Sequence, residues 1–347
     1  MDKRYFSNKL VKWYEQNHRE LPWRNTRDPY KIWLSEVILQ QTRVIQGLPY
    51  YQRFVEAFPN VKKLAAAPEQ DVLRLWQGLG YYTRARNLHK CAKVVSQQLN
   101  GEFPKHYEGL RQLPGVGDYT AAAIASIAYG LPVAVVDGNV FRVLSRVFGI
   151  ETVTNTPDGK KKFTNLANSL INTDHPDIHN QAMMEFGAMH CTQKNPLCDS
   201  CIFQSSCFAY AKNLQEKLPV KKKLKGSRKR YFYYLVFQKA KSLLMKKRVE
   251  KDIWHGLYDF MLVEKTRSTS IEKILVENKV EQNPKMIITD YYKHNLTHQT
   301  ILSKFILIKS PGRFKPEKGH KFFSLQKIAE LPKPVLISRF LSDHRLL

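Results

Sequence analysis

Hydrophobic positions divide the chain into a helical part and a later part rich in strands. In the first part apolar residues recur at helical spacing, for example at Phe6, Leu10 and Trp13. Short turns rich in glycine, proline and asparagine, such as the one at residues 78–80, separate these segments. The pattern predicts an all-helical domain over residues 1–211.

From Tyr231 onward the pattern changes to short segments of strand-like composition. We expect strands at 231–237, 242–247, 259–264, 286–292 and 304–308, and a helix at 325–331. These elements predict an α+β domain over residues 231–347. Residues 212–230 would link the two domains, and within them 217–230 contains eight Lys or Arg and no acidic residue. Such a linker is expected to be solvated and to lie near backbone phosphates if DNA is bound.

The chain carries a large positive charge. Its 347 residues include 56 Lys and Arg against 30 Asp and Glu, a net charge of +26. This excess indicates a polyanionic partner, with nucleic acid first and an anionic membrane second. The charge is spread over the whole chain and not on one amphipathic helix, which favours nucleic acid. No apolar run approaches the roughly 18 residues of a membrane span, and residues 1–16 lack a signal peptide's apolar core. We therefore expect a cytosolic protein, nucleoid-associated if the source is bacterial.

Residues 113–142 combine a glycine-rich turn with a carboxylate. The turn Leu113-Pro114-Gly115-Val116-Gly117 precedes an Ala-rich helix expected over about 119–129. Glycines allow close approach of backbone N–H groups, and a helix N-terminus favours an anion, so this turn suits a phosphate. A β-branched run at 133–136 then leads to Asp137-Gly138-Asn139. An Asp before Gly is commonly only a turn or capping residue, so this stretch alone is weak evidence.

Two further segments carry candidate side chains. Glu36 lies in an expected helix among apolar neighbours, where desolvation would raise its pKa and suit it to general acid catalysis. A solvated surface glutamate is the alternative. Tyr81, Arg84 and Arg86 follow a glycine turn, and such residues can stack on unpaired bases and hold phosphates. A helix N-terminus with core tyrosines fits that composition equally well.

Four of the five cysteines gather at residues 191–207. They are Cys191, Cys198, Cys201 and Cys207, with intervals of six, two and five residues. A disulfide pair, a zinc site and a [4Fe–4S] cluster are the candidate uses, and a cytosolic setting argues against disulfides. Thiolate softness and spacing do not choose between zinc and iron–sulfur.

Together these motifs resemble the endonuclease III superfamily of helix-hairpin-helix DNA glycosylases, in particular its adenine-removing branch. Residues 35–42 are similar to that branch's catalytic-glutamate helix, 113–121 to its helix-hairpin-helix and 136–143 to its catalytic-aspartate segment. The resemblance implies a six-helix barrel domain. It also implies a [4Fe–4S] cluster held by Cys191, Cys198, Cys201 and Cys207, which would shape a basic loop and not act as a catalyst.

The C-terminal part resembles a Nudix-type domain through its opening strands at 243–263. The acidic magnesium box of Nudix hydrolases, Gly-x5-Glu followed by Arg-Glu-x2-Glu-Glu, is missing, so we expect binding and not pyrophosphate hydrolysis. The family's tail contacts oxidised guanine with a Phe-Ser-His stretch. Here Leu296, Thr297 and His298 take that place, so the aromatic is lost while a hydroxyl and an imidazole are kept.

The resemblance also implies a mechanism of base removal. Adenine mispaired with 8-oxoguanine or guanine would be flipped out of the duplex. Glu36 would protonate N7 of adenine, Asp137 would remain ionised to stabilise the oxocarbenium sugar, and Tyr119 and Asn139 would support them by hydrogen bonding. Relatives that also cut the strand carry a lysine at the position of Tyr119, and a phenol cannot form a Schiff base, so the enzyme is expected to be monofunctional.

The expected DNA contacts come from three segments, and within them Gln41 and Tyr81 are expected to probe or wedge the base stack. The full set is Gln41, Thr42, Arg43, Tyr81, Arg84, Arg86, Leu113, Gly115, Val116 and Gly117. The expected partner is double-stranded DNA with an A:8-oxoguanine or A:G mispair, bound by a monomer.

Three other functions compete with this one. A bifunctional pyrimidine-lesion glycosylase is disfavoured by Tyr119 and by the extra C-terminal domain. A catalytically silent DNA-binding or redox-sensing protein is disfavoured because both Glu36 and Asp137 are present. A Nudix hydrolase with a DNA-binding appendage is excluded by the missing box.

Overall fold

The computed structural model describes residues 2–222, 228–282, 284–296, 298–309, 316 and 318–347. It divides into two compact units, residues 1–66 with 87–223 and residues 67–86 with 224–347. None of the described helices is long and apolar enough to cross a membrane.

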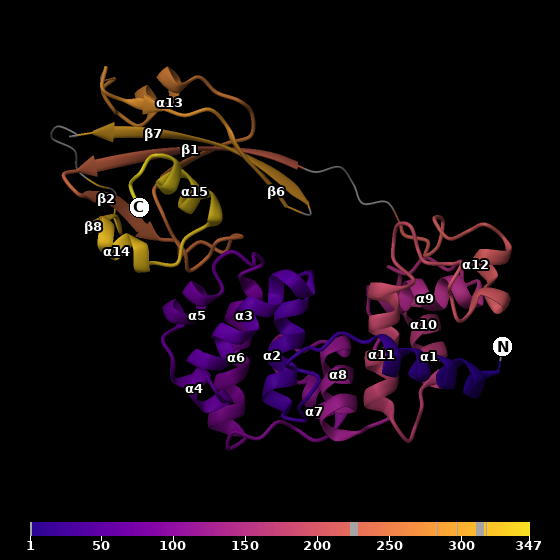
Figure 1. Ribbon diagram of the computed structural model, residues 1–347. Helices are drawn as coiled ribbons and strands as arrows, with labels where there is room; N and C mark the ends of the chain where they lie inside the picture. Colours follow the sequence, from indigo (N-terminus) through magenta and orange to yellow (C-terminus); the bar gives the residue numbers. More distant parts are fainter. Residues whose placement is uncertain (1, 223–227, 283, 297, 310–315, 317) are drawn as a thin grey trace. The chain divides into compact units, whose positions relative to one another are not determined.

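The first unit is entirely helical in its described part, which confirms the predicted class of this region (Figure 1). Its elements are α1 (Lys3–Asn17), α2 (Pro29–Leu39), α3 (Val44–Ala57), α4 (Val61–Ala66), α7 (Tyr107–Arg111), α8 (Asp118–Tyr129), α9 (Gly138–Phe148), α10 (Pro157–Leu170), α11 (Pro176–Met189), the 3-10 helix η1 (Gln204–Ser206) and α12 (Phe208–Ala211). Helix α5 (Glu69–Leu75) belongs to the second unit, and α6 (Thr83–Gln98) begins in the second unit and ends in the first.

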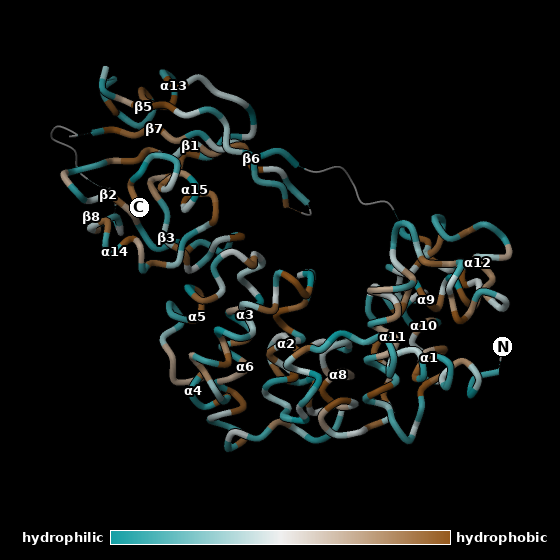
Figure 2. Tube along the Cα trace, viewed as in Figure 1, coloured by the Kyte–Doolittle hydropathy of each residue, from teal (hydrophilic) through white to brown (hydrophobic). Residues whose placement is uncertain are grey.

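Helix α8 is buried along most of its length. Residues 120–127 are all buried, and the helix packs against α2 and α11. Its alanines permit this close packing because they present little more than the backbone. Gly130 ends the helix in the left-handed conformation at φ 67°, the usual role of glycine after a helix. Figure 2 shows α8 as a largely hydrophobic segment.

A second core in the same unit joins α1 to the cysteine-bearing segment. The ring of Phe6 stacks on that of Phe203 at a centroid distance of 4.7 Å, and Trp13 meets Phe186 edge-on at 5.0 Å. Phe6, Phe186 and Phe203 are fully buried. Each fully buried side chain of this size contributes roughly 2–3 kcal/mol, so the N-terminal helix is held firmly against α11 and the segment that follows it.

The β-branched run at 133–136 forms no strand, and asparagine side chains bind its backbone instead. Asn168 accepts from the Ala134 N–H at 2.9 Å. Asn180 accepts from the Val135 N–H and donates to the Val133 carbonyl, both at 2.9 Å. These bonds supply the partners that a strand would otherwise need, and they fix the chain just before Asp137.

The described part of the C-terminal region contains a mixed sheet with helices. Its strands are β1 (Arg228–Lys239), β2 (Ser242–Lys247), β3 (Tyr258–Asp259), β4 (Met261–Lys265), β5 (Ile287–Ile288), β6 (Tyr292–Asn295), β7 (Gln299–Lys309) and β8 (Lys321–Ser324). Strands β1 and β7 pair in parallel from Arg228 opposite Gln299 to Gln238 opposite Lys309. The main order is β3-β2-β1-β7-β5, while β4 pairs with β1, β6 with β7 and β8 with β2. An α+β class for this region is confirmed.

Helices cover both faces of this sheet. On one face Tyr233, Leu235 and Phe237 share a core with Ile274 and Leu275 of α13 (Ile271–Glu277). The other face carries a stack of rings in which Phe305 of β7 lies 5.0 Å from Tyr234 and 4.2 Å from Phe340 of α15 (Val335–Asp343).

Sequence reasoning placed some C-terminal elements wrongly. The strand expected over 286–292 is two short strands, β5 and β6, both paired with β7. Between them the Thr289 side chain accepts from the Phe305 N–H at 3.0 Å and so replaces a backbone partner. Helix α14 (Leu325–Glu330) was expected, whereas α13 and α15 were not. Signals for both were present: Ser270 caps α13, and four apolar residues of α15 (Leu336, Ile337, Phe340 and Leu341) have helical spacing.

Candidate active site

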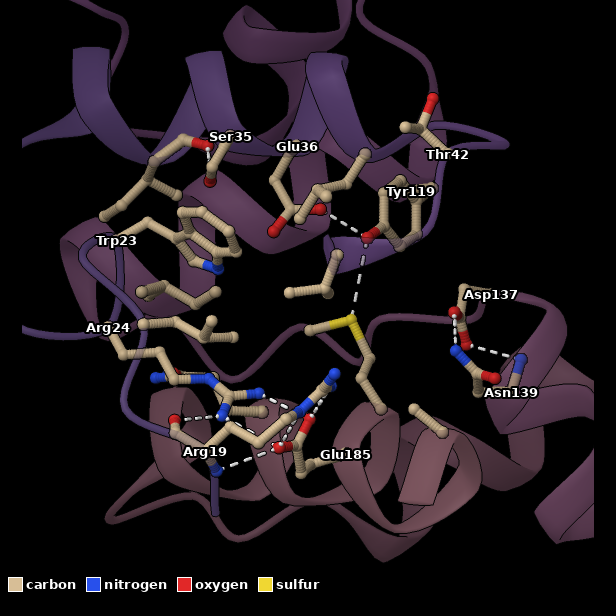
Figure 3. Close-up of a pocket in the computed structure, with 18 residues that line it drawn as sticks. Arg19, Trp23, Arg24, Ser35, Glu36, Thr42, Tyr119, Asp137, Asn139 and Glu185 are labelled. Atoms are coloured by element: carbon tan, nitrogen blue, oxygen red, sulfur yellow. Dashed lines mark hydrogen bonds and ion pairs between the residues drawn. The ribbon is translucent and has the colours of Figure 1, made fainter. Parts of the chain in front are cut away.

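A cavity of about 150 Å³ lies in the first unit (Figure 3). Three helices and the N-terminus of a fourth supply most of its walls: α2, α8, α11 and α9. Its lining side chains include Arg19, Trp23, Arg24, Glu36, Tyr119, Asp137, Asn139, Met184 and Glu185. The cavity therefore brings together all four expected catalytic residues, which come from three separate parts of the sequence.

Glu36 projects from α2 into this cavity and is only 5% exposed. Burial raises the pKa of its carboxyl to about 7, opposed by a hydrogen bond from Tyr119. The charge on Asp137 raises it further. A carboxyl with a pKa near neutrality holds a proton at the pH of the cell and can give it to a substrate atom.

The Tyr119 hydroxyl donates a hydrogen bond to Oε2 of Glu36. The same hydroxyl lies 3.6 Å from Sδ of Met184. Burial, followed by the nearby Glu36 carboxylate, raises the pKa of the phenol well above its usual value. Tyr119 therefore remains a neutral donor that orients Glu36, and it offers no nucleophilic amine.

Asp137 caps the N-terminus of α9. One carboxylate oxygen accepts from the backbone N–H groups of Asn139 and Val140, each at 2.8 Å, and the other accepts from the side-chain amide of Asn139 at 2.7 Å. Burial raises the pKa of Asp137, and these three hydrogen bonds oppose that shift. The ordinary reading of Asp before Gly as a helix cap is thus correct, and the capping geometry also turns the carboxylate toward the cavity (Figure 3).

The floor of the cavity holds a buried ion cluster that sequence reasoning missed. Glu185 of α11 accepts from Arg19 at 2.5 and 2.7 Å and from Arg24 at 2.7 and 3.0 Å. Burial would raise the pKa of Glu185, but the two guanidinium groups outweigh it and bring the pKa to about 2. No local motif marks these residues, since their partners lie more than 160 positions apart in sequence.

The two cavity carboxyls differ in environment. Glu36 has one hydrogen bond from a phenol and a pKa near 7, whereas Asp137 has three N–H donors at a helix N-terminus. Such unequal surroundings let one carboxyl stay protonated while its neighbour is ionised. An acid and an anion facing one small cavity are what cleavage of a glycosidic bond requires.

A second hollow of about 860 Å³ adjoins the same residues. Leu39, Tyr119 and Asp137 line both hollows. The larger one is also lined by Gln40 and Gln41 after α2, by Gly115 and Gly117 before α8, and by Lys160, Thr164 and Asn168 of α10. This second hollow, called the groove below, lies beside the small cavity and includes the glycines of the expected phosphate-binding turn.

Comparison with known proteins bears on the nature of this site. Residues 34–172 match the model of the HhH-GPD superfamily of base excision DNA repair proteins, and residues 232–343 match that of the NUDIX domain. An adenine DNA glycosylase of Buchnera aphidicola subsp. Baizongia pistaciae is 36% identical over 336 residues, which cover 95% of this chain and 94% of that protein. The chain belongs to the adenine DNA glycosylase family. It is therefore a DNA repair enzyme that hydrolyses N-glycosyl bonds.

Other relatives of the glycosylase agree with this assignment. The mouse adenine DNA glycosylase is 45% identical over 214 residues, covering 59% of this chain and 42% of that protein. A thermostable thymine-DNA glycosylase of known structure matches 60% of this chain and 97% of its own, at 29% identity and a TM-score of 0.56. Endonuclease III in a trapped covalent DNA intermediate matches 62% and 99%, at 26% identity and a TM-score of 0.54.

Gln41 and Tyr81, the two expected wedge residues, share an unusual backbone conformation. Both are left-handed, at φ 56° and 49°, although neither is glycine. This conformation costs a non-glycine residue about 1–2 kcal/mol. Other described residues, such as Ala240 and Lys279, also adopt it, so it does not by itself mark a DNA contact. Gln41 lines the groove, and the Tyr81 side chain is 47% exposed.

The remaining expected DNA contacts of the first unit differ in whether their side chains or only their backbone groups are accessible. Thr42 lines the small cavity, and Arg43 is exposed as the residue before α3. The side chains of Leu113 and Val116 are buried, so only their backbone groups are available to a phosphate. Gly117 has open space around its Cα hydrogens and lines the groove.

Gly115 is held by its surroundings. Its φ is +76°, and a Cβ added there would lie 2.6 Å from Cβ of Asn87 in α6. Only glycine fits this backbone conformation and this space, so the requirement for glycine is steric as well as conformational.

The two arginines of the Gly78–Arg86 segment are engaged by protein groups. The Arg84 guanidinium lies 5.1 Å from the Trp76 ring, and burial lowers its pKa to about 10. Arg86 donates to the His255 carbonyl at 2.7 Å and to Oγ1 of Thr83 at 2.9 Å. Their assignment as DNA contacts remains a prediction.

The four cysteines of the glycosylase lie in one loop region. Each is half-buried, and none of them forms a disulfide. Among the described residues no group of three or more His, Cys, Asp or Glu side chains is arranged to hold a metal ion. The buried Arg146 organises this region, since its Nη1 donates to Sγ of Cys191 at 3.4 Å and to the Thr192 carbonyl at 2.7 Å. Sequence reasoning missed Arg146, which looks like any other helical arginine.

The expected lesion-reading residues fall at the β6–β7 turn. The Leu296 N–H donates to the Gln299 carbonyl at 2.8 Å, and His298 is exposed. Thr297 lies outside the described residues. Leu296 is half-buried, consistent with a residue that closes the hairpin.

Proposed function

We propose that the protein removes adenine mispaired with 8-oxoguanine or guanine, as a monofunctional glycosylase acting as a monomer. The observation that carries this proposal is that the buried Glu36, with its raised pKa, and the hydrogen-bonded Asp137 line one cavity. Among the described residues that line this cavity there is no lysine. Tyr119 stands where strand-cutting relatives carry a lysine, and a phenol cannot form a Schiff base, so the proposed reaction is hydrolysis without strand cleavage.

Glu36 is the general acid of the proposed reaction. Protonation of adenine at N7 makes the base a better leaving group, and a carboxyl of pKa about 7 is matched to that task near neutral pH. The Tyr119 hydroxyl fixes the carboxyl through Oε2, which leaves Oε1 to face the base. Adenine must first leave the duplex, at a cost of a few kcal/mol that is least at a mispair.

Asp137 stabilises the sugar as the bond breaks. The departing base leaves positive charge on the deoxyribose ring, and an ionised carboxylate beside it lowers the barrier or captures the sugar for a time. The Asn139 amide and two backbone N–H groups hold the carboxylate in place. Because α9 begins at Gly138, its N-terminus also favours the ionised form of Asp137.

The C-terminal domain reads the partner base in this proposal. The β6–β7 turn carries Leu296 and His298, and an imidazole can donate a hydrogen bond to an oxidised guanine. The domain division we propose is 1–211 for catalysis, with its cysteine loop at 191–207, 212–230 as a basic linker and 231–347 for lesion recognition. Two bounds need correction, because β1 already begins at Arg228 and residues 67–86 group with the C-terminal region. Residues 223–227 of that linker lie outside the described part.

A [4Fe–4S] cluster fits the donor chemistry of the cysteine loop. Cys191, Cys198, Cys201 and Cys207 supply four soft thiol ligands within one short segment, the number that such a cluster takes. Bound there, the cluster would supply structural rigidity. The chain's own residues keep the segment in place, through the Phe6–Phe203 stack and the hydrogen bonds of Arg146.

The test is a single-turnover assay on a duplex with one adenine opposite 8-oxoguanine, labelled on the adenine strand. Half of each time point receives hot alkali and half does not. Product only after alkali is expected and marks a monofunctional glycosylase. Product without alkali would reveal a lyase nucleophile, and tight binding without product would show a binding protein. A Tyr119→Lys variant, which adds an amine at the cavity, is expected to gain strand cleavage.

A further inference from the structure

Arg86 makes contacts that differ from those of a phosphate-binding arginine. Its Nη1 donates to the backbone carbonyl of His255 at 2.7 Å, and its Nη2 donates to Oγ1 of Thr83 at 2.9 Å. All three residues belong to the second unit. The guanidinium therefore binds a loop of the C-terminal region, 169 positions away in sequence.

The loop that Arg86 contacts leads to the lesion-reading turn. The residue before His255 is Trp254, which is buried and whose ring lies 5.9 Å from that of His294 in β6. Strand β6 ends at Asn295, directly before Leu296 of the turn. A continuous series of contacts therefore connects Arg86 with the β6–β7 turn inside one unit.

Three further hydrogen bonds attach residues 67–86 to the same region. Gln77 donates to Oγ of Ser338 at 3.1 Å and accepts from the Lys333 N–H at 3.2 Å. Tyr82 donates to the Lys333 carbonyl at 3.5 Å. The segment that bears Tyr81 is thus attached to the C-terminal region at several points, and the bond from Arg86 attaches it to the 254–255 loop.

The residue after Arg86 faces the phosphate-binding turn. Asn87 follows Arg86 in α6, and its Cβ occupies the space beside Gly115. Asn87 and Gly115 both belong to the first unit, whereas the contacts of Arg86 with His255 and Thr83 lie within the second.

We propose that Arg86 is a positioning residue for lesion discrimination and not a DNA contact. It holds the 254–255 loop, and through Trp254 and His294 the β6–β7 turn, in the arrangement that reads the base opposite adenine. This inference rests on the proposed function of that turn. Loss of the guanidinium lowers the preference for 8-oxoguanine over guanine, while the number of phosphates bound stays the same.

The experiment compares wild type, Arg86→Ala and Arg86→Lys in single-turnover excision of adenine opposite 8-oxoguanine and opposite guanine. Arg86→Ala should lower the ratio of the two rates roughly tenfold, the effect of one hydrogen bond from a charged donor. Arg86→Lys retains one donor toward the His255 carbonyl and should restore part of the ratio. The slope of log affinity against log salt should not change.

A phosphate contact would give a different result. Loss of one such contact lowers the salt slope by about 0.9 and weakens binding to both duplexes alike, and that outcome would overturn the proposal. An unchanged ratio would overturn it too. Lys90→Ala is the matched control, because Lys90 is an exposed cation of the same helix, and its ratio should equal that of wild type.

A double-mutant cycle tests whether Arg86 acts through the turn. In a His298→Ala background, Arg86→Ala should produce little further loss of the ratio, since residues acting on one element are not additive. If the losses of the ratio in the two single variants add fully in the double variant, Arg86 does not act through the β6–β7 turn. Thr83→Val serves as a second variant if Arg86→Ala folds poorly, because it removes the Oγ1 acceptor that orients the Arg86 guanidinium and should lower the ratio in the same direction.

Hydrogen exchange separates failure of this proposal from failure of the proposed function. Peptides that cover 251–257 should exchange faster in Arg86→Ala than in wild type, whatever the β6–β7 turn reads. Unchanged amide exchange of these peptides would show that Arg86 does not hold the 254–255 loop. If wild type excises adenine equally opposite 8-oxoguanine and guanine, the lesion-reading function fails, and the exchange result still decides whether Arg86 holds the loop.

Discussion

Tyr119 donates a hydrogen bond to the Glu36 carboxyl across 83 positions of sequence. This bond joins α2 to the first turn of α8, so the acid is oriented by the helix that the glycine turn begins. It also opposes the effect of burial on the Glu36 pKa. The phenol therefore sets both where the proton is held and the pH range in which it is available.

Tyr119→Phe should move the alkaline limb of the pH–rate profile to higher pH. The active form of Glu36 is protonated, so excision slows as pH rises through its pKa of about 7. Removing the Tyr119 hydroxyl removes a bond that lowers this pKa, and the midpoint should rise by up to about one unit. Single-turnover rates from pH 5 to 9 measure it, with Tyr107→Phe as control, because the Tyr107 hydroxyl meets Asp118 and not Glu36. A downward shift would contradict this role for Tyr119.

Asp137→Asn should lose excision while keeping the fold. Asparagine caps a helix as well as aspartate, so the N-terminus of α9 stays satisfied. The charge that stabilises the sugar is gone, and the rate should fall at least roughly 100- to 1,000-fold. Thermal unfolding and lesion binding within about twofold of wild type would accompany that loss. Retained activity would remove Asp137 from the mechanism.

Glu185→Gln should destabilise the protein strongly. The change leaves Arg19 and Arg24 at the cavity floor without their counter-charge, at a cost of about 3–5 kcal/mol in urea unfolding. Asp177→Asn on the same helix is the control, since its pair with the exposed Arg27 is worth under about 1 kcal/mol. The folded-state pKa of Glu185 is depressed, so its contribution is present above pH about 4.5 and is lost as pH falls toward 2. A cost equal to that of Asp177→Asn would contradict this account.

Gly115→Ala and Gly117→Ala should separate folding from DNA binding. At Gly115 the positive φ and the contact with Asn87 make alanine costly, by more than about 1 kcal/mol. At Gly117 the backbone is extended with open space, so alanine should leave stability within about 0.5 kcal/mol. The added methyl group projects beside the groove and should weaken affinity for undamaged duplex. Equal stability of the two variants would show that the Asn87 contact does not constrain the turn.

Cys198→Ser should reduce the iron content of protein purified without oxygen, together with its visible absorbance. The cysteine segment should then become more sensitive to protease, while the Glu36–Tyr119 region, which lies in a different part of the unit, keeps its structure. Cys91→Ser is the control, because Cys91 is buried in α6 and far from the segment in sequence. Wild-type protein with stoichiometric zinc and no visible absorbance would reject the iron–sulfur proposal.

Much of the helical unit was predictable because its signals are local. The glycine turn, the alanine-rich helix and the Asp-Gly-Asn cap each lie within a few residues, and the structure forms α8 within one residue of the expected start. The two expected carboxyls do line one cavity. Family motifs contributed the decisive step, since spacing alone left Asp137 as an ordinary cap and the cysteines as ligands of unstated kind.

The amino-acid sequence, read with the family motifs, determined the helical and α+β classes of the two regions, the two candidate carboxyls Glu36 and Asp137, and a tyrosine at position 119 where strand-cutting relatives have lysine. Each of these depends on residue type and short-range order. Tertiary structure alone decided the rest. The Arg19–Arg24–Glu185 cluster, the asparagine supports of the chain before Asp137, Arg146 beside the cysteines and the Arg86–His255 bond join residues far apart in sequence. Such pairs leave no periodic or local trace, since hydrogen bonds and buried charges depend on distances that exist only after the chain has folded.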